Sequence, residues 1–298
     1  MKKYFKGNFH CHSCWSDGEA KPENVVKFYK FVGYDFVGIS DHNILTELKN
    51  QKNLDICEIP CSEYTGENYC HILAIGVSKA VKPESNSQKS DKLSILQDGI
   101  NKSIEAGGIP VIAHPFWYWT LDADIIKKTK NCYHFEICNA SPDCNSFPLP
   151  GFEPGDELWD QLLSSGRKFY GLASDDAHNY YTPYNPRAPF AGKAFNGIFS
   201  TKLSPKNILN SLKKGDFFAS TGIELKNYNV SKNYVEIEVK QIGREKTVIE
   251  FIGNEGKKLM TKTALKGKYF FKGNEKYVRI RIASTAGLWL WTQPIFLH

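Results

Sequence analysis

Apolar positions along the first 222 residues switch repeatedly between helical spacing and compact, strand-like runs. Helical spacing predicts helices over residues 22–32, 92–106, 122–130, 156–165 and 205–214. Compact apolar runs predict strands over residues 35–40, 56–65, 70–76, 109–113, 133–139, 169–174, 195–200 and 217–219. Strands that alternate with helices indicate βαβ units, so we expect residues 1–222 to form an α/β domain with a mainly parallel sheet.

The pattern changes after Gly222. The segments 233–240, 247–252 and 277–282 alternate apolar and charged residues with a period of two. Half-exposed antiparallel strands have this pattern. We therefore expect residues 223–298 to form a second, small all-β domain, of the sandwich type.

Composition is that of a globular protein, with 41% hydrophobic and 23% charged residues in a chain of 298. Residues 1–7 are basic and lead into a polar segment without the apolar core of a signal peptide. No apolar run approaches the roughly 18 residues that a membrane-spanning helix needs. We expect a cytoplasmic protein that has no membrane partner.

The net charge of +6 is unevenly distributed. Residues 223–298 hold 14 basic and 7 acidic residues, whereas residues 1–222 hold 24 basic and 25 acidic residues. A basic tail allows nucleic acid as a partner. The ordinary alternative, which we favour, is that these lysines and arginines form the solvated face of the predicted strands.

Cys11 and Cys14 have the C-x-x-C spacing of a redox dithiol. A redox pair usually opens a helix, whereas these two residues follow a predicted strand beside two histidines. The eight cysteines of the chain lie mostly in apolar or strand-like runs, where free cysteine behaves as a small hydrophobic residue. We therefore favour a structural role for them over a redox role.

Histidines and carboxylates gather where the predicted strands end. In parallel sheets, functional groups collect beyond the carboxyl ends of the strands. His42, His114 and the segment 176–178 follow such ends. Glu63 and His71 lie within or near strands, at positions that the predicted boundaries fix less well.

The N-terminal segment 8–18 adds more groups of the same kind. If it begins as a strand, His10 and His12 share one face because side chains alternate along a strand. Asp17 lies in a Ser-Asp-Gly turn that can fold its carboxylate back over them. Pro115 disfavours helical backbone at His114, so we expect His114 to be extended. The candidate metal ligands are His10, His12, Asp17, His42, Glu63, His71, His114, Asp176 and His178.

Nine imidazole and carboxylate ligands suit two or three divalent ions, because one ion takes about four to six. Ligands of these types suit Zn, Mn or Fe, and Glu63 can bridge two ions through its two oxygens. Clustered ions bind an oxyanion and make a hydroxide available near neutral pH, which is chemistry for phosphate-ester hydrolysis. Each ligand also has an ordinary structural alternative, such as turn formation for Asp17. Glu136 and Asn139 lie near a strand end but are not counted as ligands.

The ordered motifs of residues 5–222 resemble those of the PHP (polymerase and histidinol phosphatase) family. The resemblance implies a distorted seven-stranded (βα)7 barrel with a trinuclear metal site at the carboxyl end of its strands. By this resemblance, the first ion would be held by His10, His12, Glu63 and Asp176. The second ion would be held by Glu63, His71 and His114, and the third by Asp17, His42 and His178. The motifs are His10-x-His12, Asp17-Gly18, Ser40-Asp41-His42, Glu63, His71, His114-Pro115 and Asp176-x-His178.

Two features depart from the family's pattern. Some members carry a histidine where this chain has Asp17, which bears on the third metal. Members that act on nucleotides or RNA 5′ ends often have a sizeable insertion between the positions that match His71 and His114, but only 42 residues separate them here. The tail around residues 289–295 is similar to a β-domain that follows the barrel in some bacterial members.

These features predict a metal-dependent phosphoric ester hydrolase that uses a metal-bound hydroxide on a small phosphomonoester. Asp176 and His178 are its predicted catalytic residues. Arg187 and Lys193 are the nearest basic candidates for holding the phosphate, although both also suit a solvated loop. Two alternatives remain at this stage. One is a nuclease or nucleotide phosphatase whose basic tail binds nucleic acid, and the other is a metal-stabilised binding module without catalysis.

Overall fold

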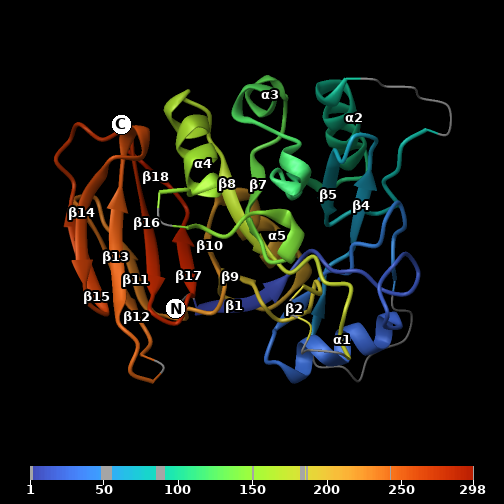
Figure 1. The fold of residues 1–298 in the computed structure, drawn as a ribbon, viewed down its shortest axis with the longest axis horizontal. Helices are drawn as coiled ribbons and strands as arrows, with labels where there is room; N and C mark the ends of the chain where they lie inside the picture. Colours follow the sequence, from blue (N-terminus) through green and yellow to red (C-terminus); the bar gives the residue numbers. More distant parts are fainter. Residues whose placement is uncertain are drawn as a thin grey trace.

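The computed structural model describes residues 3–47, 56–84, 91–149, 151–181, 185, 187–241 and 243–297. Two large sheets and one small sheet form its framework, and helices cover the flanks (Figure 1). One end of the molecule consists of strands from the C-terminal part of the chain (Figure 1). The fold is thus a mixed α/β fold with many strands and few helices.

The first large sheet runs in the order β14-β13-β16-β17-β10-β9-β1-β2-β3, with β18 paired to β16. Strands β1, β2 and β3 pair in parallel, whereas β9 pairs antiparallel with β1 and β10 pairs antiparallel with β9. The N-terminal members are β1 (Lys3–Asn8), β2 (Phe36–Val37), β3 (Cys57–Glu58), β9 (Phe195–Ser200) and β10 (Phe217–Ser220). The C-terminal members are β13 (Thr247–Ile252), β14 (Lys258–Thr263), β16 (Tyr277–Ser284), β17 (Trp289–Thr292) and β18 (Ile295–Phe296).

The second large sheet runs in chain order from β4 to β8. The pairs β4–β5 and β5–β6 are antiparallel, and β6–β7 and β7–β8 are parallel. A parallel pair needs a crossover of a dozen or more residues, which the short turn between β4 and β5 cannot supply. The strands are β4 (Cys61–Thr65), β5 (His71–Ile75), β6 (Ile109–Ile112), β7 (His134–Asn139) and β8 (Tyr170–Ser174).

Five α-helices lie in the described part of the chain, each within two residues of a predicted one at its start. Proline opens α1 and α5 at the first helical position, where its missing N–H costs nothing. Helices α2, α3 and α4 follow one another along one flank, and α1 lies on the opposite flank (Figure 1). The helices are α1 (Pro22–Phe31), α2 (Lys92–Glu105), α3 (Ala123–Lys128), α4 (Pro154–Ser164) and α5 (Pro205–Lys214).

The described strands form three separate sheets and no closed barrel, so the distorted (βα)7 barrel that the resemblance implies is not confirmed. At one seam, side-chain amides replace backbone pairing along the edge of β8. Asn196 bonds to both the N–H and the carbonyl of Ala173, and Gln293 does the same for Gly171. Single parallel bridges, Cys11 with Ala177 and His42 with Glu63, connect the sheets where the candidate ligands lie.

The C-terminal strands alternate buried and half-buried residues, as the sequence predicted. A three-stranded sheet of β11 (Leu225–Val230), β12 (Tyr234–Val239) and β15 (Lys266–Phe270) shares one apolar core with β13 and β16. Because β17 pairs with β10, one sheet continues across the predicted boundary at residue 222. The division into residues 1–222 and 223–298 stays a prediction.

Several predicted boundaries differ from the structure. The predicted strand 56–65 is interrupted at Pro60 and becomes β3 and β4, because proline cannot donate a ladder hydrogen bond. The predicted strand 35–40 is reduced to β2, and α4 starts two residues earlier than predicted. In the ranges that the structure describes, no helix is both long and apolar enough to cross a membrane.

Candidate metal centre

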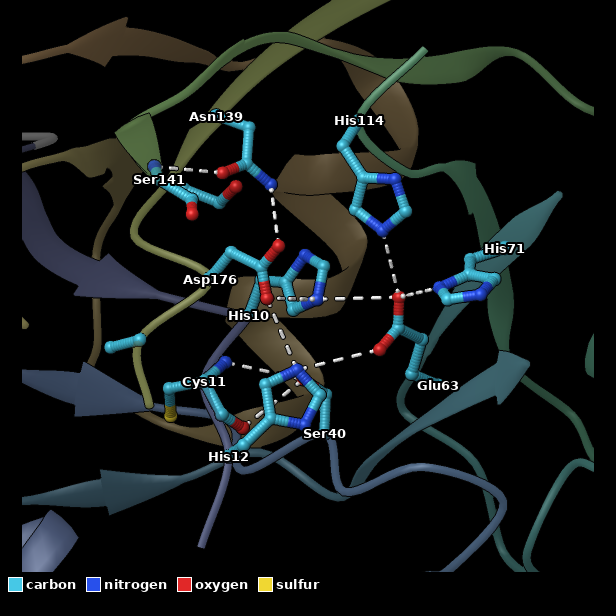
Figure 2. A network of polar contacts seen from close by, with 12 residues as sticks. His10, Cys11, His12, Ser40, Glu63, His71, His114, Asn139, Ser141 and Asp176 are labelled. Carbon is cyan, nitrogen blue, oxygen red and sulfur yellow. Dashed lines mark hydrogen bonds and ion pairs between the residues drawn. The ribbon is translucent and has the colours of Figure 1, made fainter. Parts of the chain in front are cut away.

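The Glu63 carboxylate, on β4, lies at the centre of a cluster of buried imidazoles (Figure 2). Its Oε1 atom lies 3.0 Å from His71 Nδ1, 3.1 Å from His114 Nε2 and 3.4 Å from His10 Nε2. His71 opens β5 and His114 follows β6, so neighbouring strands bring these side chains to one oxygen. His114 therefore lies at a strand end, as the sequence predicted, whereas Glu63 lies within β4 and His71 begins β5.

The second oxygen of Glu63 faces different histidines. Glu63 Oε2 lies 2.9 Å from His42 Nδ1 and 3.4 Å from His12 Nε2. The Asp176 carboxylate, which follows β8, places Oδ1 3.1 Å from the Nε2 atoms of both His10 and His12 (Figure 2). Because the two oxygens of Glu63 face different histidines, its carboxylate is suited to bridging two cations.

Asp17 joins a third group at the exposed side of the cluster. Its Oδ2 atom lies 3.3 Å from the Nε2 atoms of His42 and His178, and Oδ1 lies 3.6 Å from His12 Nδ1. The Asp17 side chain is half exposed, whereas Glu63 is fully buried. The Ser-Asp-Gly turn therefore does fold the Asp17 carboxylate back over the histidines, as predicted.

The arrangement suits divalent cations. Ligand atoms fall into four overlapping groups in which all atoms lie within 4.8 Å of one another, and these groups together contain all nine candidates. His10 Nε2 and Glu63 Oε2 are buried without a hydrogen-bond partner among the described residues. His10 Nδ1 donates to the Glu136 carboxylate at 2.7 Å, and Nε2 faces oxygens of Glu63 and Asp176; despite burial, these carboxylates raise the pKa of His10 well above its ordinary value. A divalent cation between these groups would take the place of the His10 proton at Nε2.

The electrostatics of the cluster reflect close packing of opposite charges. Burial would raise the pKa of Glu63, but His10 and His42 hold it well below its ordinary value. Burial would likewise raise the pKa of Asp176, which His10 lowers strongly. Burial lowers the pKa of His71, which favours the neutral imidazole that binds metals. Ionised carboxylates and neutral imidazoles are the forms that coordinate cations.

Two candidate ligands have left-handed backbone. His114 has φ of 26° and Asp176 has φ of 48°. The prediction that Pro115 holds His114 extended is wrong, because the His114 N–H instead donates to Glu136 Oε2 at 2.7 Å. Non-glycine residues in this region cost free energy and concentrate at functional sites. Both strand ends thus turn sharply to aim their side chains at the cluster.

The His10-x-His12 pair behaves as a strand pair would, although β1 ends at Asn8. The two rings lie 5.3 Å apart, and Cys11 is buried in a separate apolar core, with its Sγ 3.4 Å from the Gly38 carbonyl. Burial raises the pKa of the Cys11 thiol well above its usual value. Cys14 is exposed and both cysteines are free, so the structural alternative fits these residues better than a redox pair.

Glu136, on β7, supports the ligands from behind. Besides His10 Nδ1, it accepts hydrogen bonds from the hydroxyl of Ser174 and from the side-chain amide of Asn139. Asn139 also donates to Asp176 Oδ2 at 3.1 Å (Figure 2). The orientation of a metal-binding histidine is normally fixed by a carboxylate of this kind.

The loop that carries His12 and Asp17 depends on Asp41, which precedes His42. The buried Asp41 carboxylate accepts hydrogen bonds from the Ser13 N–H, the Ser13 hydroxyl and the Ser16 hydroxyl at 2.6–2.7 Å. Gly18 completes the turn, since a Cβ atom there would lie 2.3 Å from the His12 carbonyl oxygen. The Ser-Asp-His and Asp-Gly motifs thus include residues that shape the loop.

A cavity of about 330 Å³ opens onto the cluster. Arg187 lines it, as expected of a residue that would hold phosphate. Lys193 is absent from the described lining, and its ammonium donates to the Ala188 carbonyl at 3.0 Å. Sequence reasoning did not single out Trp117 and Asp143, which also line the cavity and lie in short 3-10 turns after strands.

Comparison with known proteins supports the fold. No protein-family model matches the chain, and no curated protein matches its sequence. A two-domain protein from Bacteroides vulgatus that contains a predicted PHP-like metal-dependent phosphoesterase has a similar structure, with 15% identity and a TM-score of 0.54. That match covers 95% of this chain and 90% of the other. The chain therefore shares the fold of a two-domain PHP-like protein over most of its length, which confirms the expected resemblance at the level of the fold.

Two further solved structures match a smaller part of the chain. One is a protein from Bifidobacterium adolescentis described as a candidate metal-dependent phosphoesterase, at 13% identity and a TM-score of 0.42, covering 60% of this chain and 90% of the other. The other is an amidohydrolase from Chromobacterium violaceum with bound sulfate and no metal, at 15% identity and a TM-score of 0.43, covering 58% of this chain and 87% of the other.

Proposed function

We propose that the protein is a metal-dependent phosphoesterase that hydrolyses a phosphomonoester at a centre of two or three divalent ions. The observation that carries the proposal is the Glu63 carboxylate, whose two oxygens face five histidines while Oε2 lacks a hydrogen bond. A carboxylate placed in this way is suited to bridging two cations. The shared fold with a PHP-like protein agrees with this function.

The ions would be held by the nine clustered side chains. Zn, Mn and Fe suit a ligand set of imidazoles and carboxylates. When bound, such ions neutralise phosphoryl oxygens and make water acidic enough to act as a nucleophile near neutral pH. The third position, at Asp17, His42 and His178, is the most exposed of the three and so the most open to exchange with solvent.

The chain's own residues would position the reacting groups. Asp176 is held between His10, His12 and Asn139, so its orientation is fixed before substrate enters. His178 Nδ1 donates to the Asp176 carbonyl at 2.9 Å, so Nε2 is the nitrogen that faces Asp17 Oδ2, at 3.3 Å. Arg187, on the cavity wall, would pair with the phosphoryl oxygens of the substrate.

Replacing Asp176 with asparagine tests the proposal. We expect Asp176→Asn to lower phosphate release from 4-nitrophenyl phosphate by about 100-fold or more, because it removes a charged ligand shared by His10 and His12. The matched control is Asp124→Asn, which removes an exposed carboxylate of α3 that contacts only Lys127 among described partners. The proposal fails if the metal-loaded wild-type protein releases no phosphate, or if Asp176→Asn retains the wild-type rate.

A further inference from the structure

Three aromatic side chains form a continuous surface from the candidate metal centre to solvent. We call Tyr69, Trp117 and Tyr118 the aromatic shelf. The Trp117 ring lies 5.5 Å from His71 and 5.0 Å from His114, in edge-on geometry. Tyr69 lies 5.0 Å from Trp117 and stacks on Tyr118 at 4.5 Å. The shelf thus begins at two candidate ligands and extends outwards.

Hydrogen bonds hold the Trp117 end of the aromatic shelf in place. The Trp117 indole N–H donates to Asp143 Oδ2 at 3.1 Å, and the Asn145 side-chain amide donates to the Phe116 carbonyl at 3.0 Å. Asp143 in turn accepts a hydrogen bond from the Ser141 hydroxyl at 2.6 Å. One loop therefore fixes the orientation of the ring that lines the cavity. A preorganised ring loses little conformational freedom when it binds a ligand.

The two tyrosines of the shelf have unfavourable backbone conformations. Tyr69 and Tyr118 have φ of 58° and 50°, and their neighbours Asn68 and Trp119 also have positive φ. Left-handed backbone is rare for bulky residues, and it persists where the surrounding structure over-determines it. The same tyrosines are 47% and 64% exposed, so burial in the core is not the reason. Exposed aromatic surface beside a cavity marks a binding surface.

We propose that the aromatic shelf binds the organic part of the substrate, and that this part carries a planar, uncharged aromatic ring; this inference rests on the proposed phosphoesterase function. A phosphate at the metal centre must direct its ester substituent through the cavity, one wall of which is Trp117. Ring faces and edges favour a second π-system over a saturated group of equal size. The lining carboxylate of Asp143 disfavours a second negative charge on the substrate.

The test compares 2-phenylethyl phosphate with 2-cyclohexylethyl phosphate, because both release a primary alcohol of similar size. We expect the phenyl ester to have a kcat/KM higher by on the order of fivefold to tenfold, mainly through KM. Tyr69→Leu/Tyr118→Leu should reduce this preference to about twofold or less. Tyr133→Leu is the control, since Tyr133 is an equally exposed tyrosine (48%) just before the amino end of β7, away from the cluster.

Equal kcat/KM values for the two esters, or a preference that survives in the double variant, would overturn the inference and leave the phosphoesterase proposal standing. If neither ester is hydrolysed and 4-nitrophenyl phosphate is not hydrolysed either, the phosphoesterase proposal fails instead. Calorimetric binding of 3-phenylpropylphosphonate and 3-cyclohexylpropylphosphonate to the metal-loaded protein then still decides the role of the shelf. Tighter binding of the phenyl compound that depends on the two tyrosines supports the inference, and equal binding refutes it.

Discussion

Glu136 is a fully buried carboxylate that supports two candidate ligands, His10 and His114. It accepts hydrogen bonds from the His10 ring and from the His114 N–H, both at 2.7 Å. Loss of such a supporting carboxylate typically weakens metal binding by about 10–100-fold. We therefore expect Glu136→Gln to weaken metal affinity by that factor, measured by competition with a chelating dye. Glu105→Gln, which changes an exposed carboxylate at the end of α2, should bind metal like the wild type; equal affinities in all three proteins would contradict this role.

His134 differs from the other buried histidines because it lies away from the cluster. His134 Nε2 donates a hydrogen bond to the Leu212 carbonyl at 3.1 Å, and burial lowers the pKa of His134 to about 4. Above pH 6.5 the ring is neutral in both the folded and unfolded states. Below that pH the unfolded chain binds a proton that the folded protein excludes, so the free energy of unfolding falls as the pH drops from 6.5 towards 4. The loss contributed by His134 is at most about 3 kcal/mol.

Nuclear magnetic resonance can measure this directly. The imidazole signal that is missing from the spectrum of His134→Gln identifies His134 in the wild type. We expect that signal to titrate with a midpoint near pH 4. A midpoint near 6.5 would show that the ring is accessible to solvent.

The sequence indicated which side chains gather in the cluster, because the capacity to bind a metal is carried by residue type. Most of the nine candidates came from strand ends and turns, Glu63 and His71 came from within or near strands, and the structure brings all nine into the overlapping groups. Asp41, Trp117 and Asp143 were not predicted as site residues, because a carboxylate in a loop or an aromatic ring has no distinctive spacing. Their roles depend on hydrogen bonds and ring contacts made across the fold.

At the scale of elements, local pattern predicted helices and strands but not every strand direction. The apolar run at residues 56–65 gives no indication that β4 turns back into β5 as an antiparallel pair. The pattern of apolar residues also does not predict how the edge of β8 is paired, since that edge bonds to the side-chain amides of Asn196 and Gln293 from distant parts of the chain. Local pattern does not report such long-range contacts, and the described strands do not confirm the expected distorted (βα)7 barrel.

A buried ionic network connects α4 to the C-terminal sheet. The Arg279 guanidinium, on β16, is fully buried and pairs with Asp156 at 2.5 Å and Asp160 at 2.6 Å. Arg281 adds contacts to Asp156 at 3.1 Å and to Glu250. Removing one member of such a network leaves buried charge without compensation. We expect Arg279→Met to lower the free energy of unfolding by about 3–5 kcal/mol in chemical denaturation.

Lys258→Met provides the control for this prediction. Lys258 is exposed and pairs with Glu250 at 2.7 Å, so its loss should cost about 1 kcal/mol or less. A cost for Arg279→Met as small as that of the control would show that the network contributes little. Arg279 and Arg281 contribute to the basic excess of residues 223–298, but both are buried structural residues.

At the scale of the whole molecule, the C-terminal strands are joined to the rest by a shared sheet and by this network. Deleting residues 223–298 would remove Arg279 and Arg281 and leave Asp156 and Asp160 without these partners. A loss of nucleic-acid binding in such a truncated protein could then not be distinguished from a loss of folding. Several tail lysines also pair with acidic residues on neighbouring strands, for example Lys226 with Glu238 at 2.7 Å. These pairs favour the solvated-face alternative over a nucleic-acid surface.

The nuclease alternative stays a prediction and needs a test on the full chain. Lys262→Glu/Lys272→Glu reverses two exposed charges without touching the buried network. If the tail binds nucleic acid, the wild type should bind single-stranded DNA with an affinity that falls steeply with salt, and the variant should bind more weakly. Absent or salt-independent binding by the wild type would count against this alternative.

The central claim is that Glu63 and its surrounding histidines hold a cluster of divalent ions. Elemental analysis of the freshly purified, desalted protein tests it most directly. We expect about two to three equivalents of divalent metal per chain in the wild type and in Asp124→Asn, and less than half of that in Glu63→Gln. Less than one equivalent in the wild type after incubation with Zn, Mn or Fe, or an undiminished content in a folded Glu63→Gln, would contradict the account.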